Sequence, residues 1–378
     1  MNIRIVSFLI ISATLFSCSV QKPKRNPLEN ALASQNPKIK GVMDSVAQYE
    51  VQIRYTQIDR KKDSVIFTDY DFQVDADTYF YPASTVKFPI AMLALEKLNG
   101  TADLDRDTRF YVEGDSVETT FAEAISQIFA VSDNDANNRL VEFLGQDAIN
   151  LGLEEKGIRP VRIAHRLGQH SDDLTTKPLI IYQNDSTTTI LEGIFNTAPQ
   201  SLDLKGIKKG SGFYEEDSLI AAPFDFSLKN RYPIQAQHEL LKRVIFPLNF
   251  ASEERFQLSE EQREFLLTAM HTVPRKVGYD ADEYYDGYCK FFMFGDTKKN
   301  IPSNIKIYNK VGFAYGTLTD CAYITDTQNE VEFMLTATIL VNKNGIFNDD
   351  SYEYDEVGIP FLAELGRQLY GYELNRKK

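Results

Sequence analysis

The sequence predicts a single α/β unit in which helices flank an antiparallel sheet and an all-α lobe is inserted between the two halves of the sheet. Three observations lead to this. Strand patterns lie near both ends of the chain, helical patterns fill the middle, and the last three strand patterns follow one another without a helix. The length of 378 residues suits one large unit, and 43% hydrophobic and 25% charged residues are typical of a globular protein.

The first half of the sheet comes from two strand patterns, followed by a helix. Residues 49–58 and 64–68 are the strands, and the polar stretch 60–63 between them predicts a hairpin turn. The next pattern, residues 84–98, is apolar over too wide a face for a surface helix. We therefore expect it to be a central, buried helix.

Helical patterns dominate the middle of the chain. Two of them begin with capping boxes, one at Thr120 and one at Ser259, because Glu123 and Gln262 follow three residues later. The predicted helices span residues 117–130, 136–144, 145–156, 235–246, 259–272 and 359–370. Residues 177–230 read as a β-rich insertion, either packed on the helical lobe or serving as a flap over a site. Residues 305–311, 317–325 and 331–341 predict an antiparallel meander.

The charge and the N-terminus restrict where the protein acts. A net charge of −13 argues against nucleic acid as a partner. Residues 1–17 have a basic start, a short apolar run and small residues before Cys18, as in a secretory signal. Leu15 to Cys18 resembles a bacterial lipobox, which would make Cys18 the lipidation site; a plain signal peptide is the alternative. We expect an exported monomer that touches a membrane only through this anchor.

The signal is expected to be followed by a flexible tether over residues 18–37 and a catalytic domain over 38–378. Two cysteines remain in that domain, Cys289 and Cys321. They could pair in an oxidising compartment or stay as buried free thiols. The spacing of His165 and His170 matches no metal-ligand motif, so we assign no metal and no cofactor.

Ser84 and Lys87 are the first candidates for chemistry. Their spacing of three residues places both side chains on one face of a helix start. A serine hydroxyl needs a nearby base to act as a nucleophile, and a lysine amine with a lowered pKa can be that base. For an isolated pair, a helix cap and a solvated lysine would be the simpler interpretation.

Two further motifs follow in the chain. Ser132-Asp133-Asn134 lies at a junction between helices, where the serine can relay protons and Asn134 can bind a substrate amide, although all three residue types also favour helix caps. Lys310-Val311-Gly312 ends a strand pattern. Its lysine adds positive charge, and its glycine lets a ligand approach the strand closely.

These three motifs, in this order and on these elements, resemble the penicillin-recognising serine enzymes, and most closely the class A β-lactamase family. The resemblance covers about residues 39–370 and implies a β-lactamase/transpeptidase-like fold. It implies that Ser84 is the acylated nucleophile, that Lys87 is its base or base partner, and that Ser132 passes a proton to the leaving nitrogen.

The same resemblance implies how a substrate would bind. Asn134 would hold the substrate's amide side chain, and Lys310 would attract its carboxylate beside Gly312. The backbone N–H groups of Ser84 and Phe313 would form the oxyanion hole. The substrate would be a small molecule or peptide amide, either a β-lactam or a cell-wall peptide.

Two positions depart from the family pattern. Val311 replaces a Thr or Ser whose hydroxyl helps to bind the β-lactam carboxylate, a hydrogen bond of about 1.5–3 kcal/mol. Leu167 falls where class A enzymes carry the glutamate that activates the deacylating water. His165, His170, Asp172 and Asp173 lie nearby but out of register. We therefore expect acylation to be competent and turnover of β-lactams to be slow.

Three alternatives to a β-lactamase-like hydrolase remain open at this point. One is a D-Ala-D-Ala carboxypeptidase or transpeptidase of the cell wall. Another is a non-catalytic binding lipoprotein on the same fold. A solute-binding lipoprotein would also fit the signal and the acidic body, but it leaves the three ordered motifs unexplained.

Overall fold

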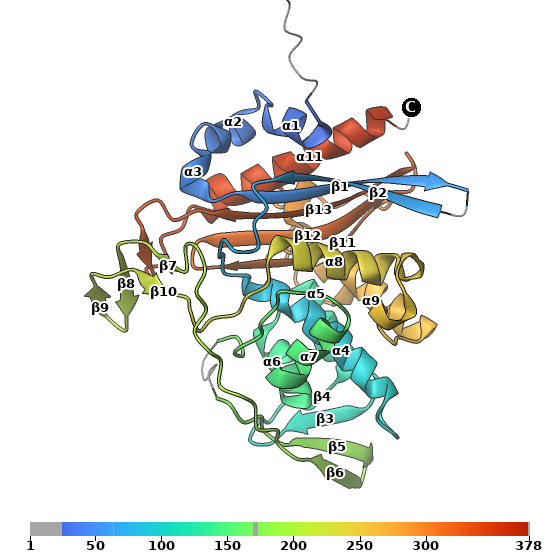
Figure 1. Ribbon diagram of the computed structural model, residues 1–378. Helices are drawn as coiled ribbons and strands as arrows, with labels where there is room; N and C mark the ends of the chain where they lie inside the picture. Colours follow the sequence, from blue (N-terminus) through green and yellow to red (C-terminus); the bar gives the residue numbers. More distant parts are fainter. Residues whose placement is uncertain (1–24, 63, 169–172, 377–378) are drawn as a thin grey trace, which may run out of the picture.

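The computed structural model describes residues 25–62, 64–168 and 173–376. At its centre is a five-stranded antiparallel sheet in the order β11-β12-β13-β1-β2 (Figure 1). The strands are β1 (Gln52–Lys61), β2 (Ser64–Phe72), β11 (Ile305–Ala314), β12 (Thr317–Asp326) and β13 (Val331–Leu340). β1 pairs with β13, with Tyr55 opposite Leu335, so the two ends of the chain meet in the middle of the sheet. The predicted hairpin, meander and split sheet are confirmed.

Helices from both ends of the chain cover one face of this sheet. They are α1 (Pro27–Leu32), α2 (Pro37–Met43), α3 (Val46–Tyr49) and α11 (Ile359–Arg376). Figure 1 shows them together on the side of the sheet that faces away from the helical lobe. Apolar side chains of α1, α2 and α11 and of the sheet form one continuous core there, in which Phe333 and Phe361 are fully buried.

The predicted flexible tether over residues 18–37 is wrong for its second half. Asn26 caps α1 with a capping box, and Pro27 occupies the first turn, where its missing N–H costs nothing. Leu28 and Leu32 are buried in the core under α11. The polar composition that suggested a tether comes from the exposed side of this helical stretch, and its apolar residues were sufficient to anchor it.

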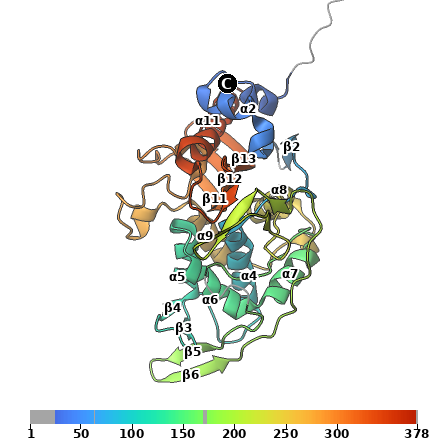
Figure 2. The same ribbon diagram turned by 90° about the vertical axis from the view of Figure 1, so that its left-hand side faces the viewer.

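The helical lobe packs against the other face of the sheet (Figure 2). It contains α4 (Lys87–Asn99), α5 (Phe121–Ala130), α6 (Asn134–Leu144), α7 (Gln146–Glu155), α8 (Ile234–Ile245) and α9 (Glu260–His271). As predicted, α4 is central and buried, and the capping boxes at Thr120 and Ser259 begin α5 and α9. The helix predicted from residue 117 begins at Phe121 instead, because residues 119–120 form β4 and pair with a neighbouring strand.

The predicted insertion, residues 177–230, divides into two parts. Its first part, β5 (Leu179–Asn184) and β6 (Thr187–Leu191), joins β3 (Arg109–Val112) and β4 (Thr119–Thr120) in a four-stranded sheet at the far end of the lobe. The second part forms β7 (Lys208–Lys209), β8 (Gly212–Glu215), β9 (Ser218–Ile220) and β10 (Phe224–Asp225), and β8 pairs with β14 (Ile346–Phe347).

The second part of the insertion is fixed beside the end of β11 by an aromatic cluster. Phe224 and Phe226 contact Tyr315, the residue that follows β11, at centroid distances of 5.3 and 5.4 Å. Tyr315 also meets Tyr81 edge-on at 5.0 Å. The insertion therefore packs against the segments on either side of the predicted site.

The fold shows the state of the two cysteines. Cys289 and Cys321 are both buried and are free thiols. No helix among the described residues combines the length and the apolar character needed to cross a bilayer. The remaining helical pieces are α10 (Phe291–Phe294), 3₁₀ turns at Ala83–Val86, Pro247–Asn249, Ser252–Glu254 and Pro274–Val277, and a π turn at Tyr354–Gly358.

Candidate active site

Ser84 lies on a 3₁₀ turn, Ala83–Val86, that leads directly into α4. The side chain is partly exposed, whereas its neighbours on both sides are buried. Ala83 has φ +48°, a conformation that costs a residue with a Cβ about 1–3 kcal/mol. The chain keeps this strained residue at the position that sets the direction of the Ser84 side chain.

Lys87 begins α4 and is completely buried. Its Nζ donates to Asn134 Oδ1 at 2.7 Å and to Ser132 Oγ at 3.3 Å, and it also donates to the carbonyl oxygen of Ser132. Asp133 caps α6 by accepting from the Ala136 N–H at 2.7 Å. The predicted loop motif therefore begins α6 and presents Ser132 and Asn134 to the lysine.

Lys310 approaches Ser132 from β11, an edge strand of the central sheet. Its Nζ donates to Ser132 Oγ at 2.8 Å and to the carbonyl oxygen of Val311 at 2.8 Å, and its side chain is buried. Ser132 Oγ thus lies within hydrogen-bond distance of two lysine nitrogens that come from different elements, α4 and β11. Like Ala83, Ser132 has a positive φ, of 60°.

Burial, with repulsion from a neighbouring lysine in each case, makes both lysines weaker bases than lysine in water. Burial, followed by the positive charge of Lys310, holds the pKa of Lys87 well below its usual value. Burial lowers the pKa of Lys310 to about 8, with a further lowering by Lys290. A neutral Lys87 amine has a lone pair with which to accept a proton, and Lys310 carries a positive charge over most of the pH range below 8.

Gly312 brings the end of β11 against the backbone of the Ser84 turn. A Cβ placed on it would lie 2.7 Å from the backbone nitrogen of Ser84 and 2.8 Å from the carbonyl oxygen of Pro82. Real Cβ atoms do not approach backbone this closely, so the position requires glycine. The next residue is Phe313, so the strand carries its N–H to the neighbourhood of Ser84.

The side chain of Phe313 does not belong to this cluster. Its ring packs against Phe291 and Tyr354 at centroid distances of 6.4 and 5.4 Å, and 48% of the side chain remains exposed. The part of Phe313 that is suited to a substrate is therefore its backbone. Cys18, the predicted lipidation site, lies outside the described residues.

The two departures from the family pattern have clear structural positions. Leu167 is buried in the hydrophobic core of the lobe, and its backbone is held by Asn138, which accepts from the Leu167 N–H at 3.0 Å and donates to its carbonyl oxygen at 2.7 Å. Val311 is buried in the core on the α11 side. Neither position presents a polar side chain to Ser84.

Of the histidines near Leu167, His165 is buried and its ring stacks on that of Tyr81 at 6.4 Å. Asp173 contributes its carbonyl oxygen to Arg166 Nη1 at 2.6 Å. His170 and Asp172 lie outside the described residues. These contacts hold His165 and Asp173 within the packed loop.

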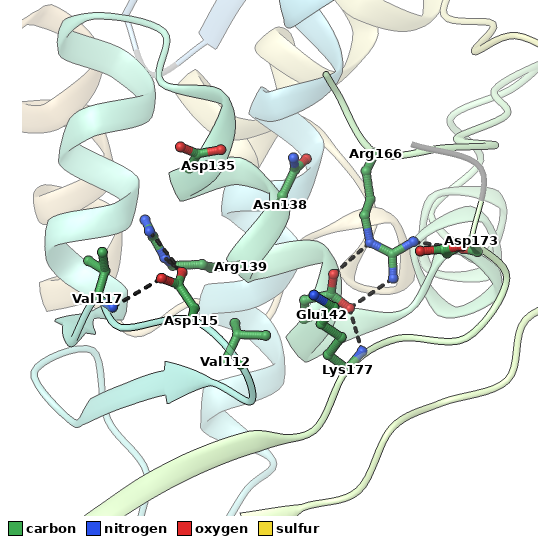
Figure 3. Close-up of a pocket in the computed structure, with 11 residues that line it drawn as sticks. Val112, Asp115, Val117, Asp135, Asn138, Arg139, Glu142, Arg166, Asp173 and Lys177 are labelled. Carbon is green, nitrogen blue, oxygen red and sulfur yellow. Dashed lines mark hydrogen bonds and ion pairs between the residues drawn. The ribbon is translucent and has the colours of Figure 1, made fainter. Parts of the chain in front are cut away.

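A cavity of about 680 Å³ lies on the outer side of α6, and neither Ser84 nor Lys87 lines it (Figure 3). Four of the charged side chains that line it form two ion pairs. Arg166 binds Glu142 through both carboxylate oxygens at 2.6 and 2.8 Å, and Arg139 binds Asp115 at 3.1 Å. The buried Arg166–Glu142 pair fixes the loop that carries Leu167 to α6.

Three buried polar residues next to the site were not identified from the sequence. Lys290 donates to Asn309 Oδ1 at 2.7 Å, and Asn309 Nδ2 donates to Asp320 Oδ1 at 2.8 Å. Asn309 immediately precedes Lys310 on β11. The only signal in the sequence was a lysine directly before the apolar run Phe291 to Phe294, where a charged residue is unusual.

Residues 36–192 match the model of a family described as "Beta-lactamase enzyme family". No curated protein sequence matches the chain.

Solved structures with a similar fold include a class A beta-lactamase from Bacteroides cellulosilyticus, with 13% identity, a TM-score of 0.51, and coverage of 92% of this chain and 98% of that chain. A beta-lactamase from Desulfarculus baarsii has 13% identity and a TM-score of 0.52, and the match covers 92% of this chain and 99% of that chain. A beta-lactamase from Burkholderia ambifaria has 15% identity and a TM-score of 0.50, and the match covers 88% of this chain and 96% of that chain. At such identities the likeness concerns the fold, and it confirms the predicted α/β architecture of an antiparallel sheet flanked by helices. The predicted all-α lobe is wrong in one respect, because β3 to β6 form a small sheet at its far end.

Proposed function

We propose that this chain is a serine hydrolase of the class A β-lactamase-like family, acylated at Ser84 by an amide or β-lactam; the match of residues 36–192 to the family model and the shared fold support this. The observation that carries the proposal is the hydrogen-bonded group beside Ser84, in which Lys87 and Lys310 both donate to Ser132 Oγ. Burying two lysines around one hydroxyl costs free energy, and function gives a reason for the chain to retain them.

In the acylation step that we propose, Lys87 loses one proton and with it one of its three donations, and the lone pair of the neutral amine then accepts the proton of Ser84 Oγ as the oxygen attacks the substrate carbonyl. The C–N bond then breaks, and the proton of Ser132 Oγ passes to the leaving nitrogen. Ser132 regains a proton from Lys87, which thereby passes on the proton that it took from Ser84 and returns to the neutral amine. The products are an ester on Ser84 and a free amine.

The substrate would be held by groups on both sides of this centre. The backbone N–H groups of Ser84 and Phe313, brought near each other by Gly312, would stabilise the oxyanion. The positive charge of Lys310 would attract a carboxylate, and Asn134 would bind an amide. Val311 offers that carboxylate no hydroxyl, so we expect weaker binding of β-lactams than in enzymes with Thr or Ser there.

Hydrolysis of the acyl-enzyme should be slow. Attack by water on the ester needs a general base. The resemblance implies that Leu167 stands at the position of the family glutamate, and its side chain is buried in the core of the lobe. We propose that the ester on Ser84 accumulates when the substrate is a β-lactam.

Labelling with a fluorescent penicillin tests the acylation step. We expect a covalent label on the wild-type protein that is absent from Ser84→Ala. Ser126→Ala is a matched control, because Ser126 donates to the Ala122 carbonyl within α5 and takes no part in the site. Labelling that survives in Ser84→Ala, or no label on the wild type from pH 6 to 9, would refute the proposal.

A cell-wall carboxypeptidase or transpeptidase is a second candidate, favoured by the buried Leu167. Such an enzyme would use the same acylation step on a peptide ending in D-Ala-D-Ala, with a peptide amine or water as acceptor. Release of D-alanine from a muropeptide, lost in Ser84→Ala, would support it over β-lactam hydrolysis. A purely binding role would instead leave the cellular phenotype intact in both Ser84→Ala and Lys87→Ala.

The sequence also supports an exported, lipid-anchored protein with Cys18 as the modified residue. Metabolic labelling with a fatty-acid analogue tests this directly. We expect incorporation in the wild type and none in Cys18→Ala, while Cys321→Ala, a change at a buried thiol, keeps the label.

A further inference from the structure

A buried polar network lies behind Lys310, and the acylation chemistry described above does not use it. Lys290, Asn309 and Asp320 are each at most 1% exposed. Lys290 Nζ donates to Asn309 Oδ1 at 2.7 Å and to the Met270 carbonyl oxygen, at the end of α9, at 2.8 Å. An isolated buried lysine is costly, so this lysine is retained at the expense of desolvation.

The orientation of the Asn309 amide follows from its two partners. A lysine can only donate, so it faces the amide oxygen, and an ionised carboxylate can only accept, so it faces the amide nitrogen. Asn309 Nδ2 accordingly donates to Asp320 Oδ1 at 2.8 Å and to the Cys289 carbonyl oxygen at 2.9 Å. Asn309 therefore bridges a positive and a negative side chain that do not touch.

Asp320 completes the network by fixing the segment that carries Lys290. Its Oδ2 accepts from the N–H groups of Phe291 and Phe292 at 3.1 and 3.2 Å. The three side chains thus connect the end of α9, the segment 289–292, β11 and β12. Asn309 is the β11 residue in this network, and the next residue on the strand, Lys310, donates to Ser132.

We propose that Lys290 is a positioning residue for the acylation site: through Asn309 and Asp320 it fixes Lys310 against Ser132, and it supplies a second buried positive charge beside that lysine. This inference rests on the proposed function, because it concerns the same reaction at Ser84.

The charges that face Lys310 come from several elements. Lys290 lowers its pKa, while Cys289 and Asp320 raise it. Lys87 lies on the other side of Ser132 and is itself affected by Lys310, Asp133 and Asp135. Removing the positive charge of Lys290 should raise the pKa of Lys310, and removing the negative charge of Asp320 should lower it.

The positioning role has a consequence for the pH dependence of acylation. If protonated Lys310 attracts the substrate carboxylate, acylation falls as the pH rises through the pKa of Lys310. Lys290→Gln should move this alkaline limb to higher pH by about half a pH unit, and Asp320→Asn should move it to lower pH. If the network had a purely structural role, the two substitutions would change the acylation rate or the stability, but they would not move the alkaline limb in opposite directions.

The test measures the acylation rate against pH and, separately, the titration of Lys310. Titration is followed by NMR of labelled lysine side chains in the intact protein, with Lys310→Met used to assign the signal. Lys306→Gln, four residues away on the same strand, is the matched control and should leave both quantities unchanged.

Opposite shifts of the Lys310 titration in Lys290→Gln and Asp320→Asn, matched by the alkaline limbs, would support the proposal. A Lys310 titration that stays within about 0.1 pH unit in either folded variant would overturn it, since an adjacent buried charge must be felt. If Lys290→Gln does not fold, Asp320→Asn carries the test. Absence of acylation in the wild type would refute the proposed function, while the NMR titration would still decide the placement of Lys290.

Discussion

Replacing Gly312 with alanine tests the contact between β11 and the Ser84 turn. The new Cβ would lie 2.7, 2.8 and 2.9 Å from three backbone atoms of residues 82–85, none of which can rotate away. The strand end must retreat by about 0.7 Å to reach an ordinary contact of 3.4 Å. Because Phe313 follows directly, its N–H moves away from Ser84 with the strand.

A shift of this size should remove much of the stabilisation that one oxyanion donor gives, a loss of about 10²–10³-fold in acylation rate. The overpacked contact should also lower the free energy of unfolding by about 1–3 kcal/mol. The assay is the second-order rate of labelling by a fluorescent penicillin, with urea unfolding measured on the same samples.

The matched control is Gly371→Ala in α11, where an added Cβ meets nothing within 4 Å. This variant should acylate at the wild-type rate and gain up to about 1 kcal/mol of stability, because alanine favours helix. If Gly312→Ala acylates within about threefold of the wild type while folded, the proposed arrangement of oxyanion donors is wrong.

Three further predictions concern pH and the departures from the family pattern. Acylation should follow a bell-shaped pH profile. The rate rises as Lys87 loses its proton, with a pKa well below the usual value, and falls as Lys310 loses its proton near pH 8. An acylation rate that is flat from pH 7 to 10 would contradict these roles. Leu167→Glu should destabilise the protein by several kcal/mol, because it buries a charge, and should not speed deacylation; a fast-turning-over variant would show that residue 167 can reach the site. Burial, and then the charge of Lys242, hold the pKa of His238 well below 6.5. Below about pH 6.5 the unfolded chain therefore binds a proton that the folded protein does not, and the free energy of unfolding should fall. An equally steep fall in His238→Gln, measured by urea unfolding, would show that another group causes it.

Much of the fold could be predicted because local patterns and long-range pairing agree. The capping boxes at Thr120 and Ser259, the apolar width of α4 and the closely spaced strands 305–341 each specify an element without reference to the rest of the chain. The order of the three motifs then predicted which elements meet, and Lys87, Ser132 and Lys310 are indeed joined by hydrogen bonds.

The sequence did not reveal features that depend on contacts between distant segments. The network of Lys290, Asn309 and Asp320 joins residues up to 30 positions apart, and none of them belongs to a spaced motif. The end of the expected tether forms α1 because Leu28 and Leu32 find the core under α11, which only the closed fold supplies. The sequence predicted a role only for the backbone N–H of Phe313, and the contacts of its ring with Phe291 and Tyr354 likewise depend on the closed fold.

Intact-protein mass spectrometry after exposure to a penicillin tests the central claim most directly, because it follows acylation and deacylation in one time course. We predict that one penicillin adds to the wild-type protein, that peptide mapping places it on Ser84, and that the adduct persists after free penicillin is removed. Ser84→Ala should gain no mass. An unmodified wild-type protein under all conditions would contradict the acylation centre, and rapid loss of the adduct with release of hydrolysed penicillin would contradict the conclusion that Leu167 leaves deacylation without a base.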